Sequence, residues 1–321
     1  MILPWVYSAL GLTILLLAGD ALVRGAVNLS LRLGVPALMV SLTIVAFGTS
    51  APELLIAIKA VEGNAPGIAL GNVVGSNTAN ILLVLGIPAM LSRLHTSECD
   101  TRKTYIFMLA ASVLFIALAY CGPFTWVSGL ILLAALALVL ADAFREARAH
   151  RCNGCGAAAD DLAALELDEV DPDMPYWRIA IYLVLGLIGL PLGANMLVEN
   201  ATIIALTYGV SDTVIGLTLV AVGTSLPELA TTVMAALRRQ ADVALGNVIG
   251  SNMFNLLAIV GIATLFGPIP VDPEFLRFDL WVMLGASLLI LPFVFFARDI
   301  TRRWGVALSG LYALYLAAVL L

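Results

Sequence analysis

Long apolar stretches separated by short polar segments run through almost the whole chain. A helix that crosses a ~30 Å hydrocarbon core needs about 20 mostly apolar residues, and ten stretches meet this requirement. They lie near residues 4–31, 36–61, 67–92, 104–121, 123–143, 177–207, 211–236, 242–267, 278–297 and 303–320. The pattern predicts an all-α integral membrane protein with ten transmembrane helices.

The polar residues inside these stretches recur. Gly48-Thr-Ser-Ala-Pro-Glu53 returns 175 residues later as Gly223-Thr-Ser-Leu-Pro-Glu228. Aligned without a gap, residues 34–87 match residues 209–262 at 25 of 54 positions. The chain is therefore an internal repeat, and each copy places one glutamate in the middle of an apolar span.

The repeat divides the chain into two halves. Residues 1–143 hold the first five predicted spans and the motif 34–87, residues 177–321 hold the other five and the motif 209–262, and residues 144–176 form a polar linker. Because five is odd, the second half must enter the membrane from the opposite side to the first. The sequence thus predicts two inverted five-helix repeats, an arrangement of many secondary transporters, whose substrate site lies near the midplane between the repeats.

Composition agrees with this class, and the basic residues predict an orientation. The chain is 61% hydrophobic and 12% charged, which is too apolar for a water-soluble domain. With the N-terminus outside, all but two of the 16 Lys and Arg residues lie on the cytoplasmic side, leaving Lys59 and Arg277 outside. We expect a multi-pass protein of the cell (inner) membrane, with both termini outside and the linker 144–176 in the cytoplasm.

Glu53 and Glu228 are the candidate functional residues. An ionisable side chain at membrane depth is costly and usually functional. No Lys or Arg lies at the same depth to pair with either acid. A buried carboxylate without a basic partner must bind a proton or a metal cation.

Oxygen-bearing neighbours favour a metal cation. Hydroxyls share a helix face with the two acids at Thr49, Ser50, Thr224 and Ser225. Pro52 and Pro227 cannot donate to the carbonyl four residues earlier and are expected to bend and interrupt the helix there, which frees backbone oxygens. The third span of each half adds a polar stripe, formed by Asn72, Ser76 and Asn80 and by Asn247, Ser251 and Asn255. Together these groups form an all-oxygen set able to reach the ~6–8 ligands that calcium prefers.

The charge of this set predicts coupled transport. One Ca²⁺ neutralises two carboxylates, whereas the two negative charges repel each other in a low dielectric when no cation is bound. The ion-free, fully ionised carrier is disfavoured. A carrier that cannot easily change conformation without an ion is an obligatory exchanger.

The paired G-T-S-x-P-E and G-N-x-x-G-S-N motifs resemble those of the calcium:cation antiporter superfamily, and within it the prokaryotic sodium/calcium exchangers. The resemblance covers nearly the whole chain. It implies the sodium/calcium exchanger fold, with four core helices around the site and two long tilted helices, here the first and sixth, that slide for alternating access.

The resemblance also implies roles for individual residues. Glu53 and Glu228 become the central acidic ligands. Around them stand Ser50, Thr49, Ser225 and Thr224, with carbonyls from Ala46 and Ala221 and hydroxyls from Ser76 and Ser251. Asn80 and Asn255, from the polar stripes, complete the expected set. Some sodium/calcium exchangers and the potassium-dependent ones carry an acid at the position of Asn255, so a potassium site that needs that acid is not carried over.

The function that we expect is Ca²⁺/Na⁺ antiport. Both ions are transported substrates, and no cofactor or nucleic-acid partner is expected. H⁺/Ca²⁺ antiport is the alternative, because buried carboxylates also carry protons, and an uncoupled channel would use the same oxygens. An enzyme is not expected, since the chain lacks the G-x-G-D, H-E-x-x-H or membrane-embedded Ser/His pair of an intramembrane protease. The sequence leaves the oligomeric state open.

Two further features have local interpretations. Cys152 and Cys155 form a C-x-x-C in the predicted linker with His150 nearby, but a fourth metal ligand is missing, so we expect a plain loop. Asp20 lies four residues before Arg24 on the first predicted helix, a spacing typical of a local ion pair.

Overall fold

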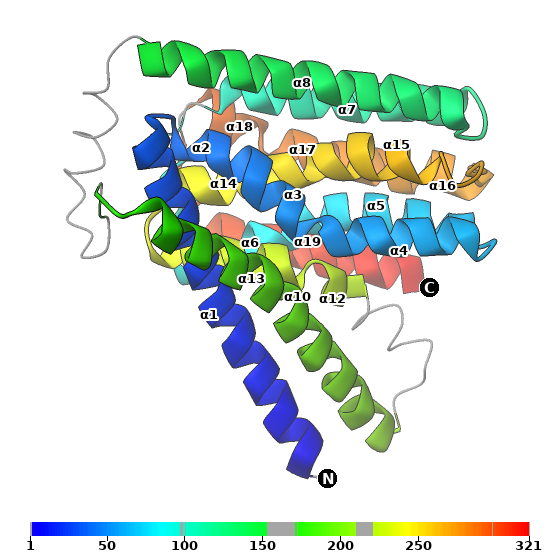
Figure 1. Cartoon of the computed structure of the whole chain (residues 1–321). Helices are drawn as coiled ribbons and strands as arrows, with labels where there is room; N and C mark the ends of the chain where they lie inside the picture. Colours follow the sequence, from blue (N-terminus) through cyan, green and yellow to red (C-terminus); the bar gives the residue numbers. More distant parts are fainter. Residues whose placement is uncertain are drawn as a thin grey trace.

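The computed structural model describes residues 2–96, 99, 101–152, 171, 173–209, 221–296 and 298–320. Over these residues the chain is helical, apart from turns and two isolated β-bridges, Leu94 with Ile300 and Phe124 with Ile269 (Figure 1). The prediction of an all-α protein is confirmed. Large apolar side chains such as Leu138 and Leu17 lie exposed on the outer surface, 73% and 66% respectively, as expected of helices that face lipid.

The first half begins with the long helix α1 (Ile2–Leu33). A broken segment follows, made of α2 (Ala37–Val40), the π-helix η1 (Ser41–Val45), α3 (Ala46–Thr49) and α4 (Ala51–Glu62). The next helices are α5 (Pro66–Ala79), the π-helix η2 (Asn80–Val84), α6 (Gly86–Leu91), α7 (Arg102–Tyr120) and α8 (Trp126–Cys152). Helix α8 continues past the predicted end of its span at residue 143, into the predicted linker.

The second half also begins with a long helix that a broken segment follows. It contains α10 (Tyr176–Thr207), α12 (Ala221–Thr224), α13 (Leu226–Leu237), α14 (Ala241–Met253), the π-helix η5 (Phe254–Ile259) and α15 (Val260–Ala263). It ends with α16 (Pro273–Arg277), α17 (Asp279–Leu289), α18 (Leu291–Phe295) and α19 (Arg302–Leu320). The first part of the predicted span 211–236 and the Cys155 thiol lie outside the described residues, as does the side chain of Cys152.

Seven helical segments of the described part are long and apolar enough to cross a membrane, or up to eight if the bent pair Ala37–Thr49 and Ala51–Glu62 is one span. Helix α13, with 12 residues, is too short to count alone. The chain is therefore a multi-pass membrane protein by length and composition of its helices.

Helices α1 and α10 form an antiparallel pair that leans away from the other helices (Figure 1). Glycines allow the two backbones to approach closely. A Cβ at Gly11 would lie 2.7 Å from the Leu197 nitrogen, and one at Gly193 would lie 2.8 Å from the Leu15 nitrogen. Because Gly25 in turn meets Leu183, the contacts run in opposite directions along the two helices.

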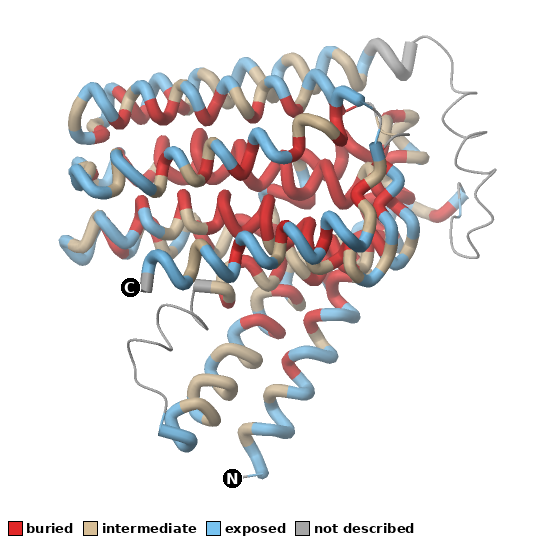
Figure 2. Tube along the Cα trace, turned by 180° about the vertical axis from the view of Figure 1, so that it is seen from behind, coloured by how far each residue is buried: buried red, intermediate tan, exposed pale blue. Residues whose placement is uncertain are grey.

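Helix α14 and its continuation η5–α15 lie at the centre of the remaining bundle. The most apolar window of Ala241–Ala263 is entirely buried, and Figure 2 shows buried residues concentrated in the middle of the helix stack. The broken segment α2–α4 and helices α5, α7 and α13 all contact this central helix. The polar side chains of Asn247, Ser251 and Asn252 on α14 are thereby buried in protein.

The two motifs break their helices at equivalent positions. Ser50 separates α3 from α4 with φ and ψ of −86° and 3°, and Ser225 separates α12 from α13 with φ and ψ of −88° and 5°. The bend at Ser50 is 42°. In both cases a proline falls in the first turn of the next helix, where its missing N–H is tolerated. The predicted interruption before each glutamate is confirmed.

Candidate ion-binding site

The two glutamates lie at the N-terminal ends of the helices that follow these breaks. Glu53 is in the first turn of α4 and Glu228 in the first turn of α13, and each is 1% exposed. A helix N-terminus favours a carboxylate electrostatically. Neither glutamate forms an ion pair with a described residue, whereas the Glu228 carboxylate lies within electrostatic range of Glu53. Two buried carboxylates therefore share a region without a cationic side chain among the described residues.

Hydroxyls of the first motif reach the second motif directly. Ser50 Oγ donates to Glu228 Oε1 at 3.3 Å. Thr49 Oγ1 lies 3.4 Å from Asn247 Oδ1 and 3.5 Å from Ser251 Oγ. The junction of α3 and α4 is thus seated against α13 and α14. Residues that the sequence separates by more than half of the chain meet here.

Several buried polar atoms near this junction have no hydrogen-bond partner among the described residues. The oxygens in this state belong to both motifs, and they are Glu53 Oε2, Glu228 Oε2, Ser225 Oγ, Asn80 Oδ1 and Asn255 Oδ1. Unsatisfied buried polar atoms are rare in native proteins and call for an explanation. A set of carboxylate, hydroxyl and amide oxygens is the donor set of a hard cation. The described part contains no cluster of three or more His, Cys, Asp or Glu, so neutral oxygens must complete any such site.

The other candidate residues lie on α3, α5, α12 and α14. Ser76 on α5 and Ser251 on α14 are 4% and 0% exposed. The Ala46 carbonyl already accepts the Ser50 N–H at 3.1 Å and the Thr49 hydroxyl at 3.3 Å. Thr224 ends α12, and Ala221, whose side chain is outside the description, begins it.

Two asparagines that the sequence interpretation passed over hold the motifs together. Asn77 and Asn252 follow Ser76 and Ser251 directly, and they bond to Asn255 and Asn80 of the opposite motif at 3.0 Å. Their presence in the repeated Gly-Ser-Asn was a usable signal. Spacing hid their role, because they lie outside the stripe of every fourth residue.

The comparisons with known proteins agree on one family. A family model described as sodium/calcium exchanger protein matches residues 3–144 and 178–321. The chain belongs to the sodium/calcium exchanger family. It is accordingly a transporter and not an enzyme.

Similar proteins match this family member over nearly its full length. The sodium/calcium exchanger MaX1 of Methanosarcina acetivorans is 35% identical over 97% of the chain and 96% of its own length. Inner membrane protein YrbG of Escherichia coli is 33% identical over 99% of the chain and 97% of its own length. The solved structure of the sodium-calcium exchanger NCX_Mj, soaked with Na⁺ and Ca²⁺, superposes with a TM-score of 0.80 at 32% identity and covers 99% of the chain and 98% of its own length. The predicted sodium/calcium exchanger fold is confirmed.

A cavity of about 520 Å³ borders the candidate site of this exchanger-family protein. Its lining includes Asn72 and Ser76 of α5, Thr224 of α12, and also Asp279 and Tyr315. A Cβ added at Gly71 or Gly75, which also line it, would meet nothing within 4 Å. These two glycines face open space and do not serve close helix packing.

The equivalent glycines of the second motif are closed in. A Cβ at Gly246 would lie 2.8 Å from the Leu38 carbonyl oxygen, and one at Gly250 would lie 2.5 Å from the Leu42 carbonyl oxygen. Here the backbone of α2 and η1 packs directly on α14. The two faces of the site therefore differ, one open at α5 and the other covered at α14.

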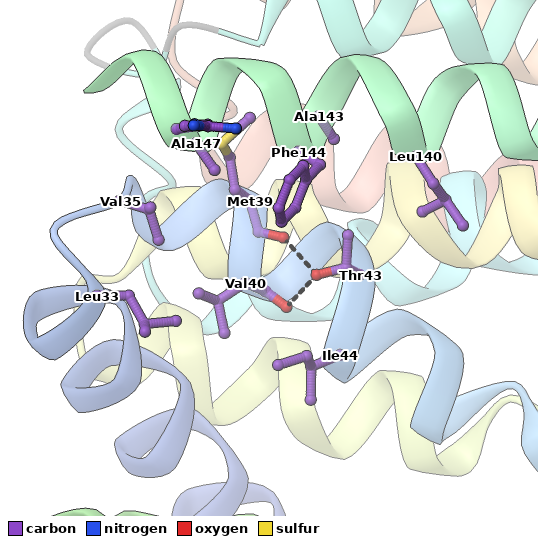
Figure 3. A pocket seen from close by; sticks show the side chains of 11 residues that line it. Leu33, Val35, Met39, Val40, Thr43, Ile44, Leu140, Ala143, Phe144 and Ala147 are labelled. Atoms are coloured by element: carbon purple, nitrogen blue, oxygen red, sulfur yellow. Dashed lines mark hydrogen bonds between the residues drawn. The ribbon is translucent and has the colours of Figure 1, made fainter. Parts of the chain in front are cut away.

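A second cavity, of about 570 Å³, lies between α8 and the α2–η1 segment, and Figure 3 shows its lining. Apolar side chains such as Met39, Ile44 and Phe144 form most of the wall. The Thr43 hydroxyl does not face it as a free group, because it donates to the Met39 carbonyl at 2.7 Å. Among the described residues its lining contains no carboxylate and none of the candidate ligands.

Asp20 forms the expected ion pair with Arg24, at 2.9 Å between Oδ2 and Nε. It also pairs through Oδ1 with Arg238, at the end of α13. The second partner was not predicted, because it joins α1 to a helix of the other half. Asp20 therefore connects the tilted helix to the bundle.

Proposed function

We propose that the protein exchanges Ca²⁺ for Na⁺ across the membrane by alternating access. The observation that carries this proposal is the set of buried oxygens from both motifs that lack hydrogen-bond partners among the described residues, grouped with two carboxylates. Desolvated oxygens of this kind need a cation. The ions are substrates, and the proposal includes no cofactor.

The proposed ligands combine charge with neutral oxygens. Glu53 and Glu228 provide the charge, and the neutral oxygens come from Ser50, Ser225, Thr49, Thr224, Ser76, Ser251, Asn80, Asn255 and the carbonyls of Ala46 and Ala221. Contacts of Ser50 with Glu228 and of Thr49 with Ser251 support the proposal that both motifs contribute to one site. The cavity along α5 provides an ion path to Ser76 and Thr224.

The choice of Na⁺ rests on the relatives and on the ligands. MaX1 is named a sodium/calcium exchanger, and NCX_Mj was soaked with Na⁺ and Ca²⁺. Two carboxylates neutralise one Ca²⁺. Three Na⁺, the number that the family resemblance implies, leave the site with a net charge of +1, so exchange is expected to respond to membrane potential.

We further propose ten spans in two inverted repeats, residues 1–143 and 177–321, with the motifs 34–87 and 209–262 at the centre. The antiparallel packing of α1 on α10 and the equivalent breaks at Ser50 and Ser225 support this arrangement. The excess of Lys and Arg on one side of the predicted spans, the side that includes the linker 144–176, supports a cytoplasmic linker and external termini. The name of YrbG, inner membrane protein, supports the same location here.

H⁺/Ca²⁺ antiport is the second candidate. The observation in its favour is that Glu53 and Glu228 are buried without an ion-pair partner among the described residues, a situation in which carboxyl groups take up protons. A proton-driven exchanger would use the same two acids. Its driving gradient distinguishes it.

The test is radiolabelled calcium uptake into proteoliposomes that contain the full chain. An outward sodium gradient, a pH gradient and no gradient are imposed in turn at clamped potential. We expect uptake with the sodium gradient alone, and a potential imposed with valinomycin and potassium should change its rate. Uptake driven only by the pH gradient would establish the proton alternative, and uptake without any gradient would indicate a channel.

A further inference from the structure

Four buried asparagines, two from each motif, form a crossed network between α5–η2 and α14–η5. Asn80 Nδ2 donates to Asn252 Oδ1 at 3.0 Å, and Asn255 Nδ2 donates to Asn77 Oδ1 at 3.0 Å. Each of the four is 1% exposed. Both bonds join one motif to the other, so the network is reciprocal.

Main-chain carbonyls determine which way Asn77 and Asn252 point. Asn77 Nδ2 donates to the Asn252 carbonyl at 3.2 Å, and Asn252 Nδ2 donates to the Asn77 carbonyl at 3.4 Å. A carbonyl only accepts, so each amide must present its nitrogen there and its oxygen on the opposite side. The thioethers of Met283 and Met108, weak acceptors, lie 3.8 Å from the same two nitrogens. The flip of both amides is thereby fixed by acceptors.

The orientation of Asn77 and Asn252 determines the orientation of Asn255 and Asn80. Since Asn77 and Asn252 present oxygen, Asn255 and Asn80 must turn their nitrogens toward them. The amide oxygens of Asn80 and Asn255 are then the atoms left without a hydrogen-bond partner among the described residues. If the amide of Asn80 or Asn255 were flipped, its oxygen would face the amide oxygen of Asn252 or Asn77. Its NH₂ group would then take the place of the oxygen that has no partner among the described residues.

We propose that Asn77 and Asn252 are positioning residues for ion binding, which hold the amide oxygens of Asn255 and Asn80 toward the transported cation. The inference rests on the proposed function, because it requires a cation at this site. An amide oxygen coordinates Ca²⁺ or Na⁺, whereas an NH₂ group repels either ion. We assign Asn77 and Asn252 a positioning role and not a ligand role, because each amide oxygen already accepts a hydrogen bond and each NH₂ group already donates one.

Asn77 and Asn252 each bind a different asparagine of the opposite motif, so removing one of them should affect only its own partner. Removing the Asn77 side chain frees Asn255 to rotate but leaves Asn252 bound to the Asn77 main-chain carbonyl. Asn80 therefore keeps its orientation. Removing the Asn252 side chain has the converse effect, since it frees Asn80 and leaves Asn77 bound to the Asn252 carbonyl.

The test is a pair of double-mutant cycles on the purified full chain. Calcium binding is measured by isothermal titration calorimetry for wild type, N77A, N255A, N80A and the doubles N77A/N255A and N77A/N80A, with thermal unfolding in parallel. We expect N77A to weaken calcium binding about tenfold and N77A/N255A to be no weaker than N255A alone. N77A/N80A should show the product of the two single effects.

Equal coupling of N77A to N255A and to N80A would show that Asn77 contributes only to packing. A lower unfolding temperature of N77A with unchanged calcium affinity would show the same. If N77A does not fold, the mirror cycle of N252A with N80A and N255A carries the same expectation with the partners exchanged. Failure of the proposed function has a different signature, which is a wild-type protein that binds no calcium. Calcium binding that is indifferent to N255A and N80A would overturn this inference while leaving exchange intact.

Discussion

Ser50 Oγ donates a hydrogen bond to Glu228 Oε1 across 3.3 Å, although 178 positions separate the two residues. The hydroxyl comes from the break before α4 and the carboxylate from the first turn of α13. One motif thus orients the acid of the other. The reverse contact is not formed in the same way, because Ser225 Oγ has no hydrogen-bond partner among the described residues.

Replacing Ser50 by alanine should therefore weaken both stability and calcium transport. A hydrogen bond to a charged group contributes about 1.5–3 kcal/mol, so we expect S50A to raise the calcium concentration for half-maximal uptake about tenfold and to lower the unfolding temperature. S225A is the matched control for stability. It should raise the half-maximal concentration with an unchanged unfolding temperature, and equal unfolding temperatures for both variants would contradict the asymmetry.

Glu53 and Glu228 should both be indispensable for exchange. E53Q and E228Q keep the shape of each side chain and remove the charge that balances Ca²⁺. We expect sodium-driven calcium uptake to fall at least a hundredfold in either variant, with unfolding temperatures equal to or above that of wild type, since a buried unpaired charge is removed. E62Q, at the exposed end of the same helix α4, is the control. An active E53Q/E228Q protein would end the site assignment.

Gly250 on α14 and Gly75 on α5 are equivalent in the repeat but have different surroundings, so their alanine substitutions form a matched pair. G250A places a methyl group 2.5 Å from the Leu42 carbonyl oxygen, whereas G75A meets nothing within 4 Å. Overpacking against backbone costs about 1–3 kcal/mol. G250A should lower the unfolding temperature by several degrees and G75A should not, as measured by thermal unfolding in detergent. Similar losses for both would mean that α5 and α14 are equally covered.

Asp20 should contribute only modestly to stability although it pairs with two arginines. The Asp20 side chain is 16% exposed and that of Arg238 23%, and ion pairs that solvent reaches are worth about 0–1 kcal/mol. In a double-mutant cycle of D20N and R238Q, we expect a coupling energy of about 0.5 kcal/mol. This coupling energy should decrease in about 1 M choline chloride, because salt screens the attraction between charges that solvent reaches. A coupling unaffected by salt would indicate a packing contact.

The sequence predicted the candidate site residues but not all of the contacts that they form. Glu53, Glu228 and the hydroxyls beside them were readable, because polar residues inside apolar spans are few and the repeat marks them twice. Asn77 and Asn252 belong to the same repeat and escaped notice. Their role depends on contacts with the other motif, and no spacing within one helix reports such contacts.

The sequence by itself determined the class of the protein, the internal repeat and the two buried acids, since these follow from local composition and from pattern. It also determined the interruptions at Ser50 and Ser225, through the prolines that follow them. Only the tertiary structure decided which face is open. Gly71 and Gly246 are equivalent in the repeat, yet one lines a cavity and the other packs on Leu38. Identical residues acquire different surroundings because packing places different segments against them.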